Sequence, residues 1–398
     1  DALDAFLTML PVRLAALLSK AVKIDVRASL LLSEATFDDA STDVVALGDI
    51  TLLAGSKVRI EGDFASSGNL EVIANGEVTS SGALTIDGTT RIHASGYDVT
   101  LGNTANEFTG TVRVTGANVT LVDQSGIDLG ASTITGNFDL TAAGVVTQSG
   151  SLTVAGTTDV NAAGFDVFLD NFANDLSGSV SVSGANVTLN DVNAIDLGVS
   201  TISGNLDVTA GGNITDSGSI VVAGTSIFNT TVNGSNIILD NAANAFLGSV
   251  TLQANSGAGT FGNITFVDSG SINFSNAPTA DGDLHIDGAT DGSVGGNLTV
   301  ISTAGNITQT DALAVVGTSS FSTLANDADI TLTNATNSFI GSMSVNTTGT
   351  SGNVSIDGGT TALDIATSSV AGDLTLISGS SITDSGTLNI AGTASFTA

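Results

Sequence analysis

Apolar and polar residues alternate in short runs along most of the chain. The run Val99-Thr100-Leu101 recurs as Val119-Thr120-Leu121 and as Val187-Thr188-Leu189, and each copy lies between turns rich in Gly, Asn, Asp and Ser. Alternation with a period of two and a β-branched residue is typical of a short strand that buries one face. Gly and Asn favour the turns between such strands. The close spacing of the runs predicts about three short strands in each turn of a coiled chain.

Longer phrases repeat along the chain and carry these runs with them. The phrase from Leu84 to Thr89 returns at Leu152, Ile220, Leu313 and Leu388; the first two steps are equal and the later two are longer. An Asn-x-Phe phrase and a Gly-Asn phrase travel with it, the first starting at Asn106 and the second at Gly136. Self-similarity of this kind indicates stacked supersecondary units. We therefore predict an all-β fold, a parallel β-helix or β-solenoid, over residues 46–398.

The distances between the phrases predict the size of one coil. The interval between the phrases at Leu84 and Asn106 is close to one third of the step from Leu84 to Leu152. One repeat is therefore interpreted as three coils of about 22 to 23 residues. In the third unit Asn244 and Gly296 are farther apart than Asn106 and Gly136 are in the first. The excess is close to the length of one coil and predicts an inserted coil near residues 251–291.

The apolar members of the repeated phrases are the predicted core. One coil cannot bury its own inward side chains, so stacked coils share continuous apolar columns. Tyr97 aligns with Phe165 and is assigned to the core as well. The other predicted core positions are Phe108, Phe138, Leu176, Leu206, Phe246 and Phe339.

Residues 1–45 differ from the rest of the chain. Leu and Phe recur at steps of three and four residues between Leu3 and Leu18, which is typical of a helix, and Pro11 would interrupt or kink that helix. The segment is interpreted as an amphipathic cap over the open end of the solenoid, or as a docking element for a neighbouring subunit. It contains half of the chain's eight basic residues, namely Arg13, Lys20, Lys23 and Arg27.

The charge balance excludes several classes of partner. The formal net charge is −31, and no Lys or Arg follows Arg113. Nucleic-acid binding requires a cationic surface, so we expect no nucleic acid. No apolar run is long enough for a transmembrane segment, and the absence of Cys excludes disulfides and thiolate metal sites. The expected partner is a second copy, bound through the N-terminal segment or the solenoid ends, with a surface ligand as the alternative.

The sequence contains no recognisable catalytic motif. His93 and His285 are far apart in the sequence and neither repeats, and neither a nucleophile elbow nor a phosphate-binding P-loop is present. Gly257 to Gly262 matches Gly-x-Gly-x-x-Gly, but no helical pattern follows it. We therefore expect no enzyme and assign no catalytic or cofactor-binding residue. A polysaccharide-acting β-helix enzyme is the least favoured alternative.

Calcium is the one candidate ion. Asp170, Asn171, Asp175 and Asp240 place oxygen atoms in turns, and calcium takes six to eight oxygen ligands. The alternative is an Asn/Asp turn in which the side chain caps its own backbone. No other cofactor is expected.

Three phrases suggest a family. They are Gly-Asn-Leu-Asp-Val-Thr-Ala from Gly204, Ile-Thr-Asp-Ser-Gly from Ile214 and Ala-Gly-Thr-Thr from Ala155. The chain resembles filamentous haemagglutinin-type adhesins and other bacterial β-strand-repeat surface proteins. The resemblance implies a right-handed parallel β-helix that is secreted and displayed at the cell surface. The Asn-Pro-Asn signatures of two-partner secretion are missing. The expected function is a structural β-solenoid, such as a fibre or sheath subunit; the alternative is an adhesin that binds ligands of host or neighbouring cells through its loops.

Overall fold

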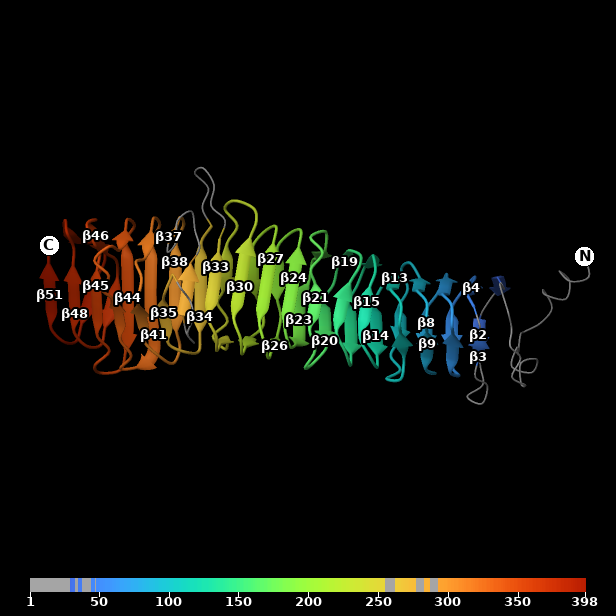
Figure 1. The fold of residues 1–398 in the computed structure, drawn as a ribbon. Helices are drawn as coiled ribbons and strands as arrows, with labels where there is room; N and C mark the ends of the chain where they lie inside the picture. The colour runs from blue at the N-terminus through green and yellow to red at the C-terminus, as the bar shows by residue number, and fades with distance from the viewer. Residues whose placement is uncertain are drawn as a thin grey trace, which may run out of the picture. The chain divides into compact units, whose positions relative to one another are not determined.

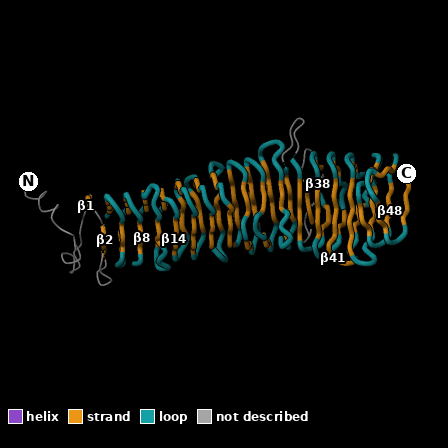
Figure 2. The backbone as a smooth tube through the Cα atoms, turned by 180° about the vertical axis from the view of Figure 1, so that it is seen from behind, coloured by secondary structure: helices purple, strands orange, loops and turns teal. Residues whose placement is uncertain are grey.

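A computed structural model describes residues 29–32, 35–37, 44–46, 48–254, 262–276, 283–286 and 293–398. The described residues form short parallel strands joined by turns, and none of them is helical (Figures 1 and 2). The chain divides into two compact units, Asp1–Gly178 and Ser179–Ala398. Both units confirm the predicted parallel β-solenoid.

In the first unit, strands of successive coils pair in parallel along three lines. The first line contains β1 (Ser29–Leu32), β4 (Ile50–Ala54), β7 (Leu70–Ala74), β10 (Thr90–His93) and β13 (Val112–Gly116). The second contains β2 (Ala35–Phe37), β5 (Val58–Ile60), β8 (Val78–Ser80), β11 (Val99–Leu101), β14 (Val119–Asp123), β17 (Phe138–Ala142) and β20 (Thr158–Asn161). The third contains β3 (Val44–Ala46), β6 (Phe64–Ser66), β9 (Leu84–Ile86) and β12 (Glu107–Phe108).

The strand β13 changes this regular pattern because it pairs with two strands of the next coil. Its first residue, Val112, is the partner of Leu129 on β15 (Ile127–Leu129), and its Thr115 is the partner of Thr133 on β16 (Ser132–Ile134). From there, β15 leads to β18 (Val146–Gln148) and β21 (Val167–Leu169), while β16 leads to β19 (Leu152–Val154) and β22 (Asp175–Leu176). One long strand thus faces a pair of short strands with a corner between them.

The repeat therefore holds ten strands, β10 to β19, and not the nine that three coils would contain. Register partners in adjacent coils of this unit are between 17 positions apart, as Val112 and Leu129 are, and 23 positions apart, as Ala35 and Val58 are. The prediction that three uniform coils make one repeat is wrong, because a repeat contains three coils and one further strand.

A repeat of ten strands moves equivalent residues from one side of the solenoid to another. β10 pairs with β7 and β13. Its equivalent in the next repeat, β20, pairs with β17 in the line of β11 and β14. Features that recur in every repeat are consequently distributed around the coil axis and do not form a row along one side.

The second unit repeats this arrangement. Here β23 (Ser179–Gly184) faces both β25 and β26, and β44 faces both β46 and β47. One line contains β24 (Val187–Asp191), β27 (Leu206–Ala210), β30 (Ser226–Thr230) and β33 (Val250–Gln253). A second contains β25 (Ile195–Leu197), β28 (Ile214–Asp216), β31 (Ile237–Leu239), β34 (Ile264–Asp268), β38 (Leu298–Ser302), β41 (Ser319–Asn326) and β44 (Met343–Thr348).

The remaining strands of this unit form shorter lines. These are β26 (Ser200–Ile202), β29 (Ile220–Val222) and β32 (Ala245–Phe246); β37 (Ser293–Val294), β40 (Ala314–Val315) and β43 (Ser338–Phe339); and β35 (Ile272–Phe274), β39 (Ile307–Gln309), β42 (Ile330–Leu332), β45 (Val354–Asp357), β48 (Leu374–Ile377) and β51 (Ala394–Thr397). Two last pairs are β46 (Leu363–Ile365) with β49 (Ile382–Asp384), and β47 (Ser368–Val370) with β50 (Leu388–Ile390).

The additional residues of the third repeat contribute one described strand, not the three of a complete coil. This strand, β36 (Asp283–Ile286), lies between β33 and β35 and pairs with both. On either side of it, β34 pairs directly with β38 and β35 pairs directly with β39. Among the described residues the regular ladders therefore continue past the insertion, and the inserted coil near residues 251–291 stays a prediction.

The predicted core is confirmed, because alternate residues of each strand point inward and are buried. Phe138 is 2 % exposed and Phe339 is fully buried. Phe228, Phe246 and Phe266 lie on β30, β32 and β34, three different lines of strands, with ring centroids 5.8 and 5.3 Å apart. Burial of one such side chain stabilises the fold by about 1.5–3 kcal/mol. The other predicted core positions, Phe108, Leu176, Leu206 and Phe246, are at most 3 % exposed.

The assignment of Tyr97 and Phe165 to the core is wrong. Their exposed fractions are 45 % and 41 %. Each follows a glycine of positive φ, Gly96 at 80° and Gly164 at 87°, in a tight turn that changes the direction of the chain. The two aromatic residues occupy equivalent turns, but the turn points both outward.

Among the described residues, the first coil pairing is that of β1 with β4, and it starts at Ser29, inside the segment assigned to the N-terminal cap or docking element. The predicted helix between Leu3 and Leu18 lies outside the described residues. Among those residues no helix is long and apolar enough to cross a bilayer.

Candidate functional site

The Asn-x-Phe phrase places a buried amide between two coils. Asn106 is fully buried. Its Oδ1 accepts the backbone N–H of Leu84 at 2.9 Å, and its Nδ2 donates to the carbonyl of Leu101 at 2.9 Å. The side chain therefore closes its own turn and pairs a backbone donor of the preceding coil. The equivalents Asn174, Asn244 and Asn337 accept the N–H groups of Leu152, Ile220 and Leu313 in the same way.

A second side chain completes this contact, and its identity varies between repeats. Gln148 accepts the Nδ2–H of Asn174 at 3.1 Å and the backbone N–H of Asn171 at 3.2 Å through Oε1. It also donates from Nε2 to the Oδ1 of Asn174. Gln309 makes the same bonds to Asn337 and Asn334. The Gln side-chain amide suits this position because it offers both a hydrogen-bond donor and an acceptor to the buried Asn.

Asp216 takes this place in the middle repeat. Its carboxylate accepts the backbone N–H of Asp240 at 2.8 Å and the Nδ2–H of Asn244 at 2.6 Å. Burial raises the pKa of Asp216, the three hydrogen bonds it accepts oppose that rise, and the charge of Asp240 adds to it. A carboxylate lacks the donor that Gln148 and Gln309 provide, so this repeat has the less complete network.

A buried Asp that recurs in three repeats was not predicted from the sequence. Asp123 is 1 % exposed and accepts the backbone N–H of Phe108 at 2.9 Å and that of Ser125 at 2.7 Å. Asp268 accepts the N–H of Phe246 at 3.0 Å. Burial raises the pKa of both carboxyls. The available signal was the acid that ends the repeated run in Val119–Asp123, Val187–Asp191 and Ile264–Asp268.

The Gly-Asn phrase forms a ladder along one corner. Asn118 accepts the backbone N–H of Asn137 at 3.0 Å, and Asn137 accepts that of Thr157 at 3.0 Å. Glycine is needed where the corners of two coils touch, since a Cβ on Gly110 would lie 2.4 Å from the carbonyl oxygen of Gly88. The same contact joins Asn69 to Thr89, Asn205 to Thr225 and Asn297 to Thr318.

The calcium candidates fall in two separate turns. Asp170, Asn171 and Asp175 belong to the turn between β21 and β22 in the first unit, whereas Asp240 follows β31 in the second. The Oδ1 of Asn171 accepts the N–H of Ala173 at 2.9 Å, and the Oδ1 of Asp175 accepts a hydrogen bond from Ser177 at 3.2 Å. No group of three or more His, Asp or Glu side chains suited to a metal occurs within the described residues.

These bonds favour the alternative in which the Asn and Asp side chains cap their own turn. Calcium binding remains a prediction. If it occurs, millimolar calcium should raise the thermal midpoint by mass action.

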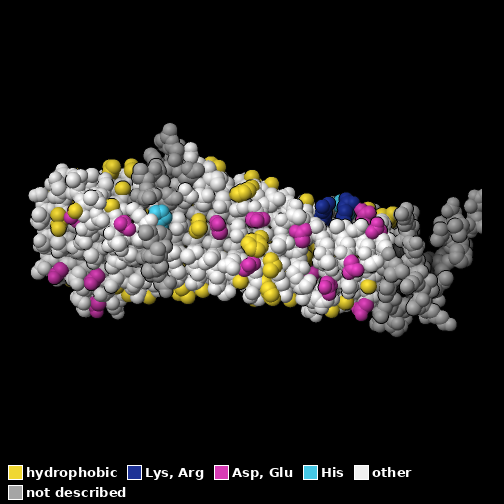
Figure 3. All heavy atoms as spheres, in the orientation of Figure 1, with side chains coloured by type: hydrophobic (Ala, Val, Ile, Leu, Met, Phe, Trp, Pro, Cys, Tyr) yellow, Lys and Arg dark blue, Asp and Glu magenta, His cyan; other side chains and the backbone are white. Residues whose placement is uncertain are grey.

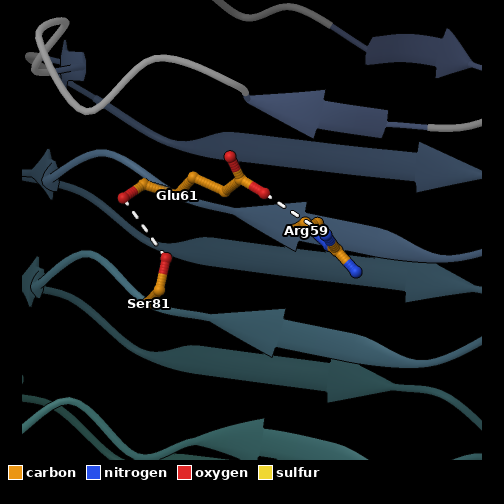
Figure 4. Close-up of polar contacts among 3 residues, drawn as sticks. All are labelled: Arg59, Glu61 and Ser81. Carbon is orange, nitrogen blue, oxygen red and sulfur yellow. Dashed lines mark hydrogen bonds and ion pairs between the residues drawn. The ribbon is translucent and has the colours of Figure 1, made fainter.

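Ion pairs are few on the surface of the described residues. Arg59 and Glu61 form one on the outer side of β5, with Nη1 and Oε1 3.4 Å apart, and Ser81 donates to the backbone oxygen of Glu61 (Figure 4). The Arg59 side chain is 50 % exposed, and an exposed pair of this kind contributes about 0–1 kcal/mol. His93 lies on β10 in the first unit and His285 on β36 in the second.

One protein family matches most of the chain. It is described as repeats of unknown function (DUF5649), and it matches residues 47–115, 116–183, 184–253, 261–346 and 351–398. Comparison with curated proteins and with solved structures gives no match.

Proposed function

The chain belongs to the DUF5649 repeat family, and from that premise we propose that it is a structural protein. In this proposal it is a secreted β-solenoid displayed at the cell surface, where copies assemble into a fibre or sheath. Assembly uses the N-terminal segment or the solenoid ends. Catalysis and cofactors have no part in the proposal.

The use of the repeated polar side chains carries this proposal. The buried Asn of the Asn-x-Phe phrases, the buried Asp123 and Asp268, and the corner Asn of the Gly-Asn phrases bond to a neighbouring coil. Residues that recur for binding or catalysis would leave polar atoms free for a ligand. Here the recurring atoms hold the coils together, which is what a structural repeat requires.

The ten-strand repeat supports the same proposal. Equivalent outward positions, such as Arg91 on β10 and Asp159 on β20, lie on different lines of strands. A protein that presents one motif many times along a single face would keep equivalent residues on one line.

An adhesin is the second candidate, and the exposed Phe172 favours it. Phe172 is 71 % exposed at the tip of the turn after β21, and its equivalents are Thr104 and Ala242. A bulky apolar side chain at a turn tip suits contact with a ligand. The resemblance to filamentous haemagglutinin-type surface proteins supports surface display for both candidates.

Electron microscopy of the purified chain, with and without residues 1–40, tests the proposal. We expect filaments or sheets from the intact chain and none from the truncated chain, with circular dichroism showing that the truncated chain stays folded. Separate particles that bind to cells and lose that binding upon Phe172→Ser would support the adhesin and contradict the structural role. Protease treatment of intact producing cells tests display, since a surface protein is degraded without lysis.

A further inference from the structure

Two arginines lie side by side on the outer surface of the first unit. Arg91 on β10 and Arg113 on β13 are register partners in adjacent coils, and both side chains are exposed. Arg91 also bonds to Glu71, its register partner on the other side. Arg113 has no ion pair among the described residues. On the face seen in Figure 3, the Lys and Arg side chains are gathered in a single patch. Like charges on register partners are destabilising, so the Arg91–Arg113 pair lowers the stability of the fold. The chain has only eight Lys and Arg, and two of them are in this pair.

A pair of the opposite charge lies on another line of strands of the same unit. Asp139 on β17 and Asp159 on β20 are register partners, and both are exposed. Partial desolvation raises the pKa of Asp159, and the charge of Asp139 raises it further. No Lys or Arg follows Arg113 in the sequence. The Arg in this line of strands, Arg59 on β5, lies four strands before β17, so the acidic pair has no Lys or Arg on the strands next to it.

The two pairs are related by the repeat. A step of one repeat, the step that takes Leu84 to Leu152, also takes Glu71 to Asp139 and Arg91 to Asp159. The two positions that form an ion pair in the first repeat are thus both occupied by Asp in the second. Because the ten-strand repeat moves equivalent strands to a different line, the basic pair and the acidic pair face different directions on one unit.

Both pairs span a single step between coils, which is about 4.8 Å in a β-sheet. The Cα spacing of the two arginines therefore matches that of the two aspartates, and Arg can bind a carboxylate with two hydrogen bonds. We propose that copies of this chain associate through Arg91 and Arg113 of one copy and Asp139 and Asp159 of the next. The proposal rests on the proposed function and adds a second contact, between outer surfaces of the solenoid, which the filament needs in addition to the N-terminal segment or the solenoid ends.

A second copy fits better than another anion because both halves of the contact are present on each chain. Each copy that binds through its arginines still presents its aspartates, so the contact can pass from copy to copy. The net charge of −31 opposes association in general. At physiological ionic strength the Debye length is about 8 Å, so repulsion between distant parts of two copies is screened. Association is then determined by the charges at the contact itself.

Sedimentation velocity with charge-reversed variants tests this proposal. Variant one carries Arg91→Asp and Arg113→Asp, and variant two carries Asp139→Arg and Asp159→Arg. Each alone should lose self-association by more than about a hundredfold, because like charges then face each other. An equimolar mixture should form a heterocomplex, since the arginines of variant two meet the aspartates of variant one. The matched control is Arg59→Asp, which reverses a charge on β5, outside both residue pairs, and should leave association unchanged.

The outcomes separate this proposal from the structural role itself. Circular dichroism and thermal midpoints verify that all variants are folded. Restored association in the mixture, lost again at high salt, supports the proposed contact. Association that survives both reversals overturns the contact while leaving the structural role intact. An intact chain that stays monomeric at all salt concentrations overturns both.

Discussion

Leu84 and Asn106 are one coil apart, and the backbone N–H of Leu84 donates to the Oδ1 of Asn106 at 2.9 Å although the amide is completely buried. A buried amide that lost its partner would cost free energy comparable to that of a lost hydrogen bond. This pairing recurs in four repeats. It explains why Asn is kept at a position where an apolar residue would otherwise suit the core.

Substitution of this Asn should therefore destabilise the fold. We expect Asn106→Ala to lower the free energy of unfolding by about 1–3 kcal/mol, because the N–H of Leu84 is left buried and unpaired. Urea unfolding measures the change. Thr104→Ala, at the exposed tip of the same turn, is the control and should have little effect. Equal losses in the two variants would show that the turn, and not the buried bond, is responsible.

Removal of any of four buried hydroxyls should, in contrast, not reduce the stability of the fold. The hydroxyls of Thr90, Thr158, Ser226 and Ser319 are buried and have no hydrogen-bond partner in the described structure. Thr90→Val keeps the shape and removes a desolvated polar group, so stability should stay within about 0.5 kcal/mol or increase. Thr323 is the matched control, since its Oγ1 donates to the carbonyl of Ala328 at 3.2 Å. Thr323→Val should cost about 1 kcal/mol, and a similar cost at Thr90 would reveal a partner there.

The carboxyl of Asp216 should make stability depend on pH. Because its pKa is raised in the folded state, the folded chain binds a proton more readily than the unfolded chain. Its contribution to stability therefore increases as pH falls toward the ordinary Asp pKa of about 3.9, and is lost as pH rises through the raised pKa. Asp123 and Asp268 act in the same direction.

The repeats supply reciprocal variants for this test. Asp216→Gln restores the amide found at Gln148 and Gln309, so the thermal midpoint at neutral pH should rise and its increase on acidification should shrink. Gln148→Asp should lower the midpoint at neutral pH and introduce a new increase on acidification. Thermal unfolding between neutral pH and about pH 4 measures both. Identical pH profiles for the two variants and the parent chain would contradict the assignment.

Substitution of a buried aromatic residue by a charged one gives the largest expected loss of stability. Phe138 is 2 % exposed, and Phe138→Asp places a charge without a partner in the core. We expect a loss of more than about 4 kcal/mol, enough to unfold a marginally stable chain. Phe172→Asp is the control, because Phe172 is 71 % exposed. A cooperative melt at the parental temperature for Phe138→Asp would show that this strand is assigned to the wrong face.

The sequence was sufficient to predict the solenoid and most of its core. Each Val-Thr-Leu run buries its first and third residues, as in β11 and β14, because a strand alternates its side chains across the sheet. The same rule correctly placed Phe108 and Phe138 in the core.

The pairing between coils could not be predicted in the same way. The run Val112–Gly116 reads as one ordinary strand, and nothing in it indicates that it faces two strands of the next coil. The roles of Asn106 and Asp123 depend on that pairing, because their partners are backbone N–H groups of another coil. The assignment of Tyr97 to the core was wrong for a related reason, because the glycine of positive φ before it, Gly96, forms a turn that points Tyr97 outward.

The ten-strand repeat depends most on the pairing of β13 with both β15 and β16, which adds a tenth strand to the repeat. Thr115 and Thr133 are register partners there, and the Cα separation of adjacent parallel strands, about 4.8 Å, lies within the range that a disulfide bridges. The chain has no Cys of its own. Under mild oxidation Thr115→Cys with Thr133→Cys should close a disulfide, detected by mass spectrometry. Three uniform coils per repeat would instead bring Thr115 close to Asn137, so a disulfide in Thr115→Cys with Asn137→Cys, and none in the first pair, would contradict the ten-strand repeat.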